Sequence, residues 1–558
     1  MPSLTRDEFV ALVKQSGGGT LAIPISLRLL ADQLTPVLAY RRLVSADERT
    51  APSFLLESVE GGERQGRHSI LGAQPILEVI ARGNDVRVTD CASGKTIVSH
   101  ETDPLLKLRS ITANTKLVLP PQKRGSGSLP QCFLGGWVGF AGYDTVRYAE
   151  PDKLKGGPRD DRGLPDLHFG LYDGVAVFDH VDKLVHIVQL AIVPAGTDPV
   201  AAYDHARRRL DERAEQIQRH SKPLPSGVVD RELPTVPLPS NTTKAQHAAM
   251  IARAKEYIRA GDIFQVVLGQ RFERRSKADP FDVYRALRAV NPSPYMVYLQ
   301  ARGCILVASS PEILCRVRAS PTGPAQLPLP LLAGEGGRGS ARPGEGEARP
   351  AQSTFIVTNR PLAGTRKRGQ TPEEDAALER ELLADPKERA EHIMLVDLGR
   401  NDVGQVAIPG SISLPRIMEV ERYSHVMHIS STVTGTLRPG LDCWDALRSA
   451  LPVGTISGAP KIRAMQVIDE LEPVRRGPYG GGMGYVGLDG QMDIALALRT
   501  MVVPTALHSA DGWVYHLQAA GGIVADSDPE AEFQETVNKA AALARAIELA
   551  ERAFANKA

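Results

Sequence analysis

The segment NTTKAQHAAMIARAKEYIRAGDIFQVVLGQRF (residues 241–272) changes its hydrophobic period from that of a helix to that of a strand. Residues 243–260 carry apolar side chains at the i, i+3 and i+7 spacing of a helix with one buried face. Gly261 suits the position just after the helix, and residues 263–272 then alternate as a strand does. Helix and strand recur in this way to the C-terminus, so we expect a mixed fold of helices and strands.

A proline-rich segment divides the chain of 558 residues into two regions. Residues 221–241 (SKPLPSGVVDRELPTVPLPSN) contain five prolines and no apolar period, which is typical of a linker. We therefore expect an N-terminal region over residues 1–235, itself a mixture of strands and helices, and a second region over residues 242–555.

Residues 318–352 form a low-complexity segment inside the second region. Glycine, proline and arginine are spaced there so that no apolar face can form. Such a composition predicts a disordered surface insertion.

The overall composition is that of an ordinary globular protein. Hydrophobic residues make up 42% and charged residues 23%, and 66 basic against 65 acidic residues leave a net charge of +1. This balance gives no electrostatic basis for binding nucleic acid or an anionic membrane surface. Five scattered cysteines, with no signal peptide and no apolar run long enough to span a membrane, favour a cytoplasmic protein.

Residues 388–402 (ERAEHIMLVDLGRND) predict a helix in which Glu391 shares a stripe with Leu395 and Leu398. A carboxylate in line with apolar residues points toward a core or a cleft. It needs a partner there, because an unpaired buried charge is costly. The partner is either a bound cation or a core arginine.

A second carboxylate of interest is Glu535, in the helix that begins after Asp528. Asp528 is a good N-cap before Pro529, and acidic residues in the first turn, including Glu532, suit the helix dipole. That explanation does not extend to Glu535. Two helix carboxylates, with no Cys or His at zinc spacing, suit a hard cation such as Mg²⁺.

Other polar residues fit a site for a small anion. Arg499 lies in an apolar alternating run, where it is either an inward carboxylate anchor or an outward edge residue. His425 and His428 would point to opposite faces of a strand, which leaves one inward histidine, either functional or structural. Three glycine-rich loops could approach an anion closely without matching a nucleotide-binding fingerprint, namely residues 453–461, 477–484 and 518–525.

Nine strings of the second region resemble the chorismate-utilising enzymes, and among these most resemble component I of anthranilate synthase. They occur in the family's order over about 280 residues. The N-terminal region resembles the same enzymes through ADQLTPVLAYRRL (31–43), LLES (55–58) and GGWVGFAGYDTVRY (135–148). The nine strings are GDIFQVVLGQRF (261–272), NPSPYM (291–296), SSPE (309–312), PLAGTRKRG (361–369), ERAEHIMLVDLGRND (388–402), YSHVMH (423–428), GTISGAPK (454–461), RRGPYGGGMGY (475–485) and DPEAEFQETVNKA (528–540).

The resemblance implies an α+β fold of two large, packed antiparallel sheets with helices outside, in which the N-terminal half is intertwined with the catalytic half. It makes Glu391 and Glu535 the ligands of Mg²⁺, which would bind the ring carboxylate of chorismate. It places chorismate against a set of residues of which Arg499 would hold the enolpyruvyl carboxylate. The set is Gln265, Gly364, Thr365, Tyr479, Arg499, Ala520, Gly521 and Gly522.

The reaction implied by the resemblance is addition of ammonia at ring C2 with loss of the C4 hydroxyl, followed by elimination of pyruvate to give anthranilate. Glu312 would protonate the departing hydroxyl, and His428 would assist near the metal and in the second step. Thr455 matches the threonine typical of anthranilate synthases, which eliminate pyruvate on the same enzyme.

Two further positions distinguish members of the family. Relatives that add water carry a lysine base where this chain has Gln265, and common aminodeoxychorismate synthases carry a nucleophilic lysine where it has Ala363. Aminodeoxychorismate synthase component I and a non-catalytic tryptophan-binding subunit remain the alternatives.

The resemblance also implies regulation and a partner. Ser58, together with Pro294, Tyr295 and Met296, resembles the tryptophan pocket of feedback-inhibited members. The chain contains no glutaminase region with a nucleophilic cysteine. A separate glutamine amidotransferase subunit is therefore expected to supply ammonia, in a hetero-oligomer.

Overall fold

The computed structural model describes residues 3–44, 51–60, 64–121, 129–221, 224, 226–227, 237–320, 354–423 and 426–554. These residues build two large sheets of twelve strands each and a small two-stranded ribbon. Neighbouring strands of the large sheets are antiparallel except β1 and β9, which are parallel. The ribbon consists of β3 (Val59–Glu60) and β4 (Arg64–Gln65).

The first sheet contains, in spatial order, β22 (Gly458–Ala459), β14 (Gln265–Ser276), β26 (Trp513–Ile523), β25 (Thr500–Pro504), β16 (Cys304–Ser310), β15 (Tyr295–Ala301), β2 (Ser53–Glu57), β5 (His68–Ala73), β12 (Gly174–Asp179), β13 (Leu184–Val193), β1 (Thr20–Leu30) and β9 (Thr115–Leu117).

The second sheet contains β19 (Leu362–Lys367), β21 (Val426–Thr436), β18 (Phe355–Arg360), β17 (Ile313–Ala319), β24 (Met492–Leu496), β23 (Gly482–Gly487), β10 (Gly136–Ala141), β11 (Leu167–Tyr172), β6 (Leu77–Arg82), β7 (Asp85–Asp90) and β8 (Thr96–His100), with β20 (Ser413–Arg422) paired to β21.

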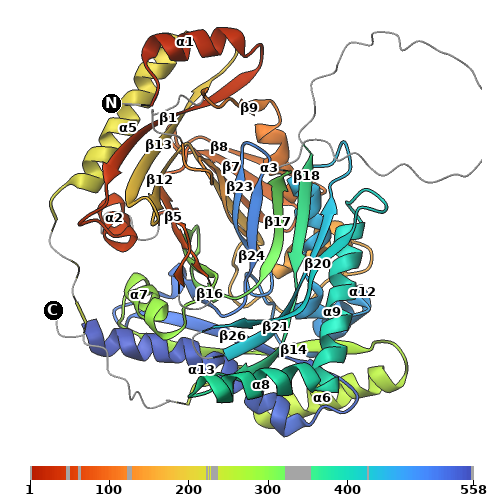
Figure 1. Ribbon diagram of the computed structural model, residues 1–558. Coiled ribbons are helices and arrows are strands. Elements are labelled where there is room, and N and C mark those ends of the chain that lie inside the picture. The colour runs from red at the N-terminus through yellow and green to blue at the C-terminus, as the bar shows by residue number, and fades with distance from the viewer. Residues whose placement is uncertain are drawn as a thin grey trace, which may run out of the picture.

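Helices lie outside the sheets (Figure 1). Helix α5 packs on β13 and β1, α13 packs on β26 and β14, and α9 packs on β19 and β21. The helices are α1 (Arg6–Gln15), α2 (Pro36–Leu43), α3 (Leu105–Thr112), α4 (Val146–Ala149), α5 (Pro199–Gln218), α6 (Lys244–Arg259), α7 (Pro280–Val290), α8 (Pro372–Ala384), α9 (Pro386–Gly404), α10 (Cys443–Ala450), α11 (Gly454–Ser457), α12 (Lys461–Leu471) and α13 (Pro529–Phe554).

Both large sheets combine strands from before and after the proline-rich segment. In the first sheet β2 pairs with β15, where Leu56 lies opposite Val297. In the second sheet β10 pairs with β23, where Val138 lies opposite Tyr485. The expected α+β fold of two large antiparallel-rich sheets is confirmed, and the two halves of the chain are intertwined within it.

The two sheets bury a shared core between them. Phe54 and Leu306 contribute to it from the first sheet, and Phe140 and Met483 from the second, each no more than 1% exposed. Burying one such side chain stabilises a fold by roughly 1.5–3 kcal/mol. This packing holds the strand ends that carry the polar residues described below.

The segment that opened the sequence analysis forms α6 and β14 as expected, with Thr243 as the N-cap and Gly261 at a φ of 80°. The strand begins at Gln265 and not at residue 263. The N–H of Phe264 instead bonds to the carbonyl of Ala459 at 2.7 Å, and the Phe264 side chain is 74% exposed.

The first two residues of the predicted insertion lie in a strand. Residues 318 and 319 belong to β17, where Ala319 pairs with Phe355 of β18, because their backbone completes this antiparallel pair. Residues 321–353, most of the predicted linker and His425 lie outside the described residues. None of the described helices is long and apolar enough to cross a membrane.

Candidate active site

A cleft of about 760 Å³ is lined by β14 and β26 of the first sheet, by β19 and β21 of the second, and by helices α9 and α13. It brings together every predicted catalytic, metal and substrate residue except Gly521. These residues are Gln265, Glu312, Gly364, Thr365, Glu391, His428, Thr455, Tyr479, Arg499, Ala520, Gly522 and Glu535.

Glu312 lies between β16 and β17 and is only 2% exposed. Thr455 Oγ1 donates a hydrogen bond of 2.8 Å to its Oε1. Burial raises the pKa of Glu312 to about 8, although this bond and one from the backbone of Leu362 act in the opposite direction. Glu312 is therefore a protonated carboxylic acid at neutral pH, able to donate a proton inside the cleft.

His428, on β21, is buried with its Nδ1 close to two acceptors. Nδ1 lies 2.9 Å from the carbonyl oxygen of Gly364 and 3.1 Å from Thr365 Oγ1. A carbonyl oxygen only accepts, so Nδ1 carries the hydrogen and Nε2 keeps a lone pair. Burial lowers the pKa of His428 to about 4, which makes the imidazole a neutral acceptor at physiological pH.

Arg499 is not in a strand, as its alternating neighbours suggested, but in the connection from β24 to β25. Its φ is 47°, in the left-handed region, and the N–H of Ser309 bonds to its carbonyl at 3.1 Å. Among the described residues its guanidinium has no hydrogen-bond or ion-pair partner, although it lines the cleft. Such an unpaired fork suits a carboxylate ligand.

The first sheet forms a tightly packed wall of the cleft. Gln265 Nε2 lies 3.4 Å from Glu391 Oε1. A Cβ at Gly522 would lie 2.4 Å from Gln265 Nε2, so a side chain cannot be accommodated there without displacing the glutamine. Tyr479, in the loop before β23, is hydrogen-bonded to the backbone of Ala520 on β26.

Four glutamates from two helices form an acidic side of the cleft next to this wall. Glu388 and Glu391 come from α9, and Glu532 and Glu535 come from α13. Burial, and then the negative charge of Glu388 and Glu535, raise the pKa of Glu391. Lys539 pairs with Glu535 at 2.6 Å and partly balances the cluster.

The carboxylates on the acidic side of the cleft are the kind of ligand that a magnesium ion prefers. Among the described residues no three His, Cys, Asp or Glu side chains form a group that could hold a metal by themselves. Mg²⁺ often uses only one or two protein carboxylates and completes its shell with other oxygens. Glu391 and Glu535 provide such a pair, and the buried Oε2 of nearby Glu532 has no partner among the described residues.

Comparison with known proteins shows the family of this chain. The family model described as chorismate binding enzyme matches residues 52–323 and 352–545. The chain belongs to this family. It is 50% identical to anthranilate synthase alpha subunit 1, chloroplastic, of Arabidopsis thaliana, covering 96% of this chain and 87% of the relative. It is 40% identical to anthranilate synthase component 1 of Pseudomonas aeruginosa, covering 98% and 99%.

Solved structures of the chorismate-binding enzymes have the same fold. Component I of anthranilate synthase from Streptococcus pneumoniae TIGR4 aligns with a TM-score of 0.65 at 32% identity, over 93% of this chain and 99% of that one. The menaquinone-specific isochorismate synthase of Escherichia coli aligns with a TM-score of 0.61 at 18% identity, over 97% and 99%. The expected resemblance is confirmed, and the family match omits residues 324–351, within the predicted insertion.

A second cavity of about 710 Å³ lies beside the cleft of this chorismate-binding enzyme. The four residues predicted to bind an inhibitor, Ser58, Pro294, Tyr295 and Met296, all line it. Tyr295 donates a hydrogen bond of 2.7 Å to Asp493. The two cavities share one lining residue, Pro311, which directly precedes Glu312.

Sequence reasoning missed several polar residues of the cleft. Glu532 was explained as a helix-start acid, yet it is 7% exposed and accepts a hydrogen bond from Ser527. Glu388 and Lys539 also line the cleft. Glu388 lies three residues before Glu391, and Lys539 lies four residues after Glu535. Residues at these spacings share one face of a helix, which is the signal that could have identified them. Gly521, outside the cleft lining, packs against Glu532, since a Cβ there would lie 3.0 Å from its Oε2.

Proposed function

We propose that this chain is the chorismate-using subunit of an anthranilate synthase, converting chorismate and ammonia to anthranilate, pyruvate and water. The observation that supports this most strongly is the protonated Glu312 facing the same cleft as the unpaired Arg499 and the four glutamates. The cleft thus offers an acid, a carboxylate anchor and a site for a cation, which are the groups that the reaction needs.

Binding uses two different parts of the cleft. The Arg499 guanidinium pairs with the enolpyruvyl carboxylate, and the acidic side receives the ring carboxylate with Mg²⁺. The bound ion, held by Glu391 and Glu535, would supply positive charge that stabilises negative charge on the ring carboxylate. Gly522 lets the substrate approach the Gln265 wall closely.

In the first step Glu312 gives its proton to the C4 hydroxyl, which leaves as water while ammonia bonds to C2. Thr455 holds the Glu312 carboxyl through its hydrogen bond. In the second step the C2–H proton is removed and the bond from the ring to the enolpyruvyl oxygen breaks. The ring becomes aromatic, and the released group takes up a proton to become pyruvate. His428 Nε2, a neutral acceptor, suits removal of the C2 proton.

Two residues that line the cleft favour amination at C2 over the reactions of other family members. Gln265 offers no base to activate water, and Ala363, which lines the cleft, offers no amine for a covalent intermediate. The chain therefore suits ammonia attack and not isochorismate or 4-amino-4-deoxychorismate formation.

We further propose that the second cavity binds L-tryptophan as a feedback inhibitor and that a separate glutamine amidotransferase subunit supplies ammonia. The shared Pro311 supports communication between the two cavities, since a ligand that moves it would also move Glu312.

The test is to mix the purified chain with chorismate, Mg²⁺ and excess ammonium near pH 8, where part of Glu312 still carries its proton, and to follow anthranilate fluorescence. Anthranilate and pyruvate in equal amounts are expected. Isochorismate or 4-amino-4-deoxychorismate as the product would contradict the proposal.

A further inference from the structure

Arg476 is a fully buried arginine outside the cleft, with a donor group directed at each of three partners. It is 2% exposed. Its Nη1 donates to the carbonyl of Ile456 and its Nη2 to the carbonyl of Val267, each at 2.7 Å. Its Nε and Nη2 also form a bidentate pair with Glu472, at 2.9 and 2.6 Å.

The two carbonyls belong to segments that carry residues of the cleft. Ile456 directly follows Thr455 in the four-residue helix α11, and Val267 lies two residues after Gln265 on β14. Both Ile456 and Val267 line the cleft, whereas Arg476 does not. A helix as short as α11 leaves its last carbonyls without partners inside the helix, so the guanidinium supplies the missing donor.

The N-terminal half holds Arg476 in place. The guanidinium carbon lies 4.7 Å from the centroid of the Tyr143 ring. Arg162 Nη2 donates to the backbone carbonyl of Arg476 at 2.9 Å, and the N–H of Tyr143 donates to the carbonyl of Gly477 at 2.8 Å. The N-terminal half of the chain therefore contacts both the guanidinium of Arg476 and the backbone at Arg476 and Gly477.

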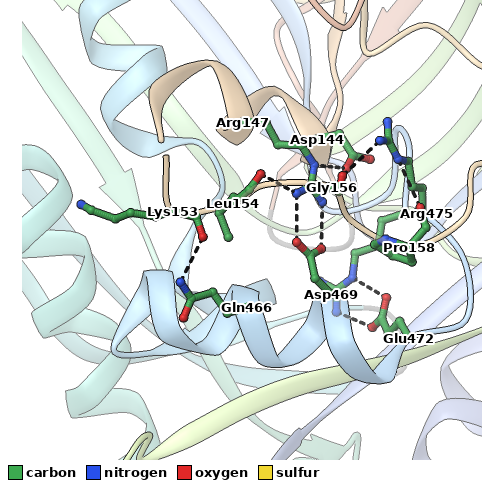
Figure 2. A network of polar contacts seen from close by, with 11 residues as sticks. Asp144, Arg147, Lys153, Leu154, Gly156, Pro158, Gln466, Asp469, Glu472 and Arg475 are labelled. Atoms are coloured by element: carbon green, nitrogen blue, oxygen red, sulfur yellow. Dashed lines mark hydrogen bonds and ion pairs between the residues drawn. The ribbon is translucent and has the colours of Figure 1, made fainter. Parts of the chain in front are cut away.

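Figure 2 shows how the same region of the N-terminal half is fastened to α12. Arg147 binds Asp144 and makes a bidentate contact with Asp469, at 2.9 and 2.8 Å. Arg475, next to Arg476 in the chain, donates to the carbonyl of Gly156. This network fixes the end of α12 from which Glu472 reaches Arg476.

We propose that Arg476 is a positioning residue that holds Thr455, and through it the Glu312 carboxyl, in the geometry needed for proton transfer. The proposal rests on the proposed function, which assigns that proton transfer to Glu312. A planar guanidinium reaches both carbonyls and Glu472 at fixed angles, which a lysine ammonium cannot do. A purely structural ion pair with Glu472 would not require the two carbonyls of the cleft walls.

The test compares Arg476→Lys with Arg41→Lys, a matched arginine outside the cleft that pairs with Asp279 at 2.6 Å and stacks on Phe281. For Arg476→Lys we expect kcat to fall at least about tenfold with KM for chorismate within about threefold of wild type, because a displaced proton donor slows the reaction more than binding. Arg41→Lys should keep wild-type kcat per folded molecule.

A second variant tests whether a fall in kcat could result from loss of folding. The double substitution Arg476→Met with Glu472→Gln removes the buried pair without leaving a single unpaired charge. It should show the same selective fall in kcat, with circular dichroism and the thermal midpoint reporting the folded fraction. Unchanged kcat per folded molecule in both Arg476 variants would overturn the positioning role while leaving the proposed function intact. A wild-type chain that forms no anthranilate would overturn both.

Discussion

Thr455 Oγ1 donates a hydrogen bond of 2.8 Å to Glu312 Oε1, joining two segments that lie 143 residues apart in the chain. The bond lowers the pKa of Glu312, whereas burial raises it more strongly, to about 8. The protonation state of the proposed acid therefore depends on a contact between α11 and the strand connection that carries Glu312.

This contact predicts a specific pH dependence. Turnover should be high below pH 8 and should fall as the pH rises through about 8, because Glu312 then loses the proton that it donates. Thr455→Val removes the bond, so the alkaline limb should move to higher pH and kcat should fall. The measurement is kcat against pH at constant free ammonia, with Thr434→Val, on β21, as the control. An unchanged alkaline limb in Thr455→Val would exclude Glu312 as its origin.

Glu312→Gln should make the free energy of unfolding less dependent on pH. It should also remove turnover. The folded-state pKa of about 8 is above the usual 4.5, so the stability contributed by the protonated carboxyl is fully present below about pH 4.5. It is lost as the pH rises through about 8, at about 1.4 kcal/mol for each pH unit within that window. The variant lacks this loss, and its kcat should fall at least about 100-fold. Urea unfolding at several pH values measures the effect, with exposed Glu373→Gln as the control. Parallel pH profiles of stability in wild type and Glu312→Gln would contradict it.

Arg499→Lys should raise KM for chorismate more than it lowers kcat. A lysine cannot form the bidentate pair with a carboxylate, and we expect a rise in KM of about 10- to 100-fold from the loss of a charged hydrogen bond. Steady-state kinetics measures this, with the exposed Arg259→Lys on α6 as the control. A wild-type KM in Arg499→Lys would remove Arg499 from the substrate site.

Glu535→Gln should remove Mg²⁺-dependent turnover while the fold stays intact, because one of two proposed carboxylate ligands is lost. The matched control is Glu530→Gln on the same helix, whose glutamate is exposed and pairs with Lys244. Calorimetric titration with Mg²⁺ and activity across Mg²⁺ concentrations measure binding and turnover. Near-normal values for Glu535→Gln would show that the ion is held elsewhere.

Periodicity and family resemblance together predicted much of this architecture, because they depend on local sequence. Glu391 was found from its place on an apolar helix stripe, and the structure places it in the cleft. The resemblance predicted two packed sheets shared by the halves of the chain, which pairing of β2 with β15 and of β10 with β23 confirms.

Features that depend on distant contacts could not be predicted in this way. The alternating pattern around Arg499 predicts a strand. In the structure Arg499 lies in the connection between β24 and β25, with a positive φ and with its carbonyl bonded to the N–H of Ser309. Arg476 belongs to the string RRGPYGGGMGY (475–485), which the sequence analysis used only for its family resemblance. Its burial depends on Glu472, four residues earlier in the chain, and on Tyr143 of the other half. Such pairs are visible only after the two halves are brought together.

Ser58→Leu should abolish inhibition by tryptophan without reducing uninhibited activity by more than about twofold, because Ser58 lines the second cavity and not the cleft. The backbone leaves little room for a larger side chain to turn away, since the Gly66 N–H bonds to the Ser58 carbonyl at 2.7 Å and a Cβ at Gly66 would lie 2.7 Å from the Ser58 Cβ. The leucine would therefore occupy volume that the inhibitor needs. Anthranilate formation at increasing tryptophan, together with calorimetric tryptophan binding, measures both effects, and the exposed Ser110→Leu on α3 is the control. Inhibition of Ser58→Leu at wild-type tryptophan concentrations would show that the inhibitor binds outside this cavity.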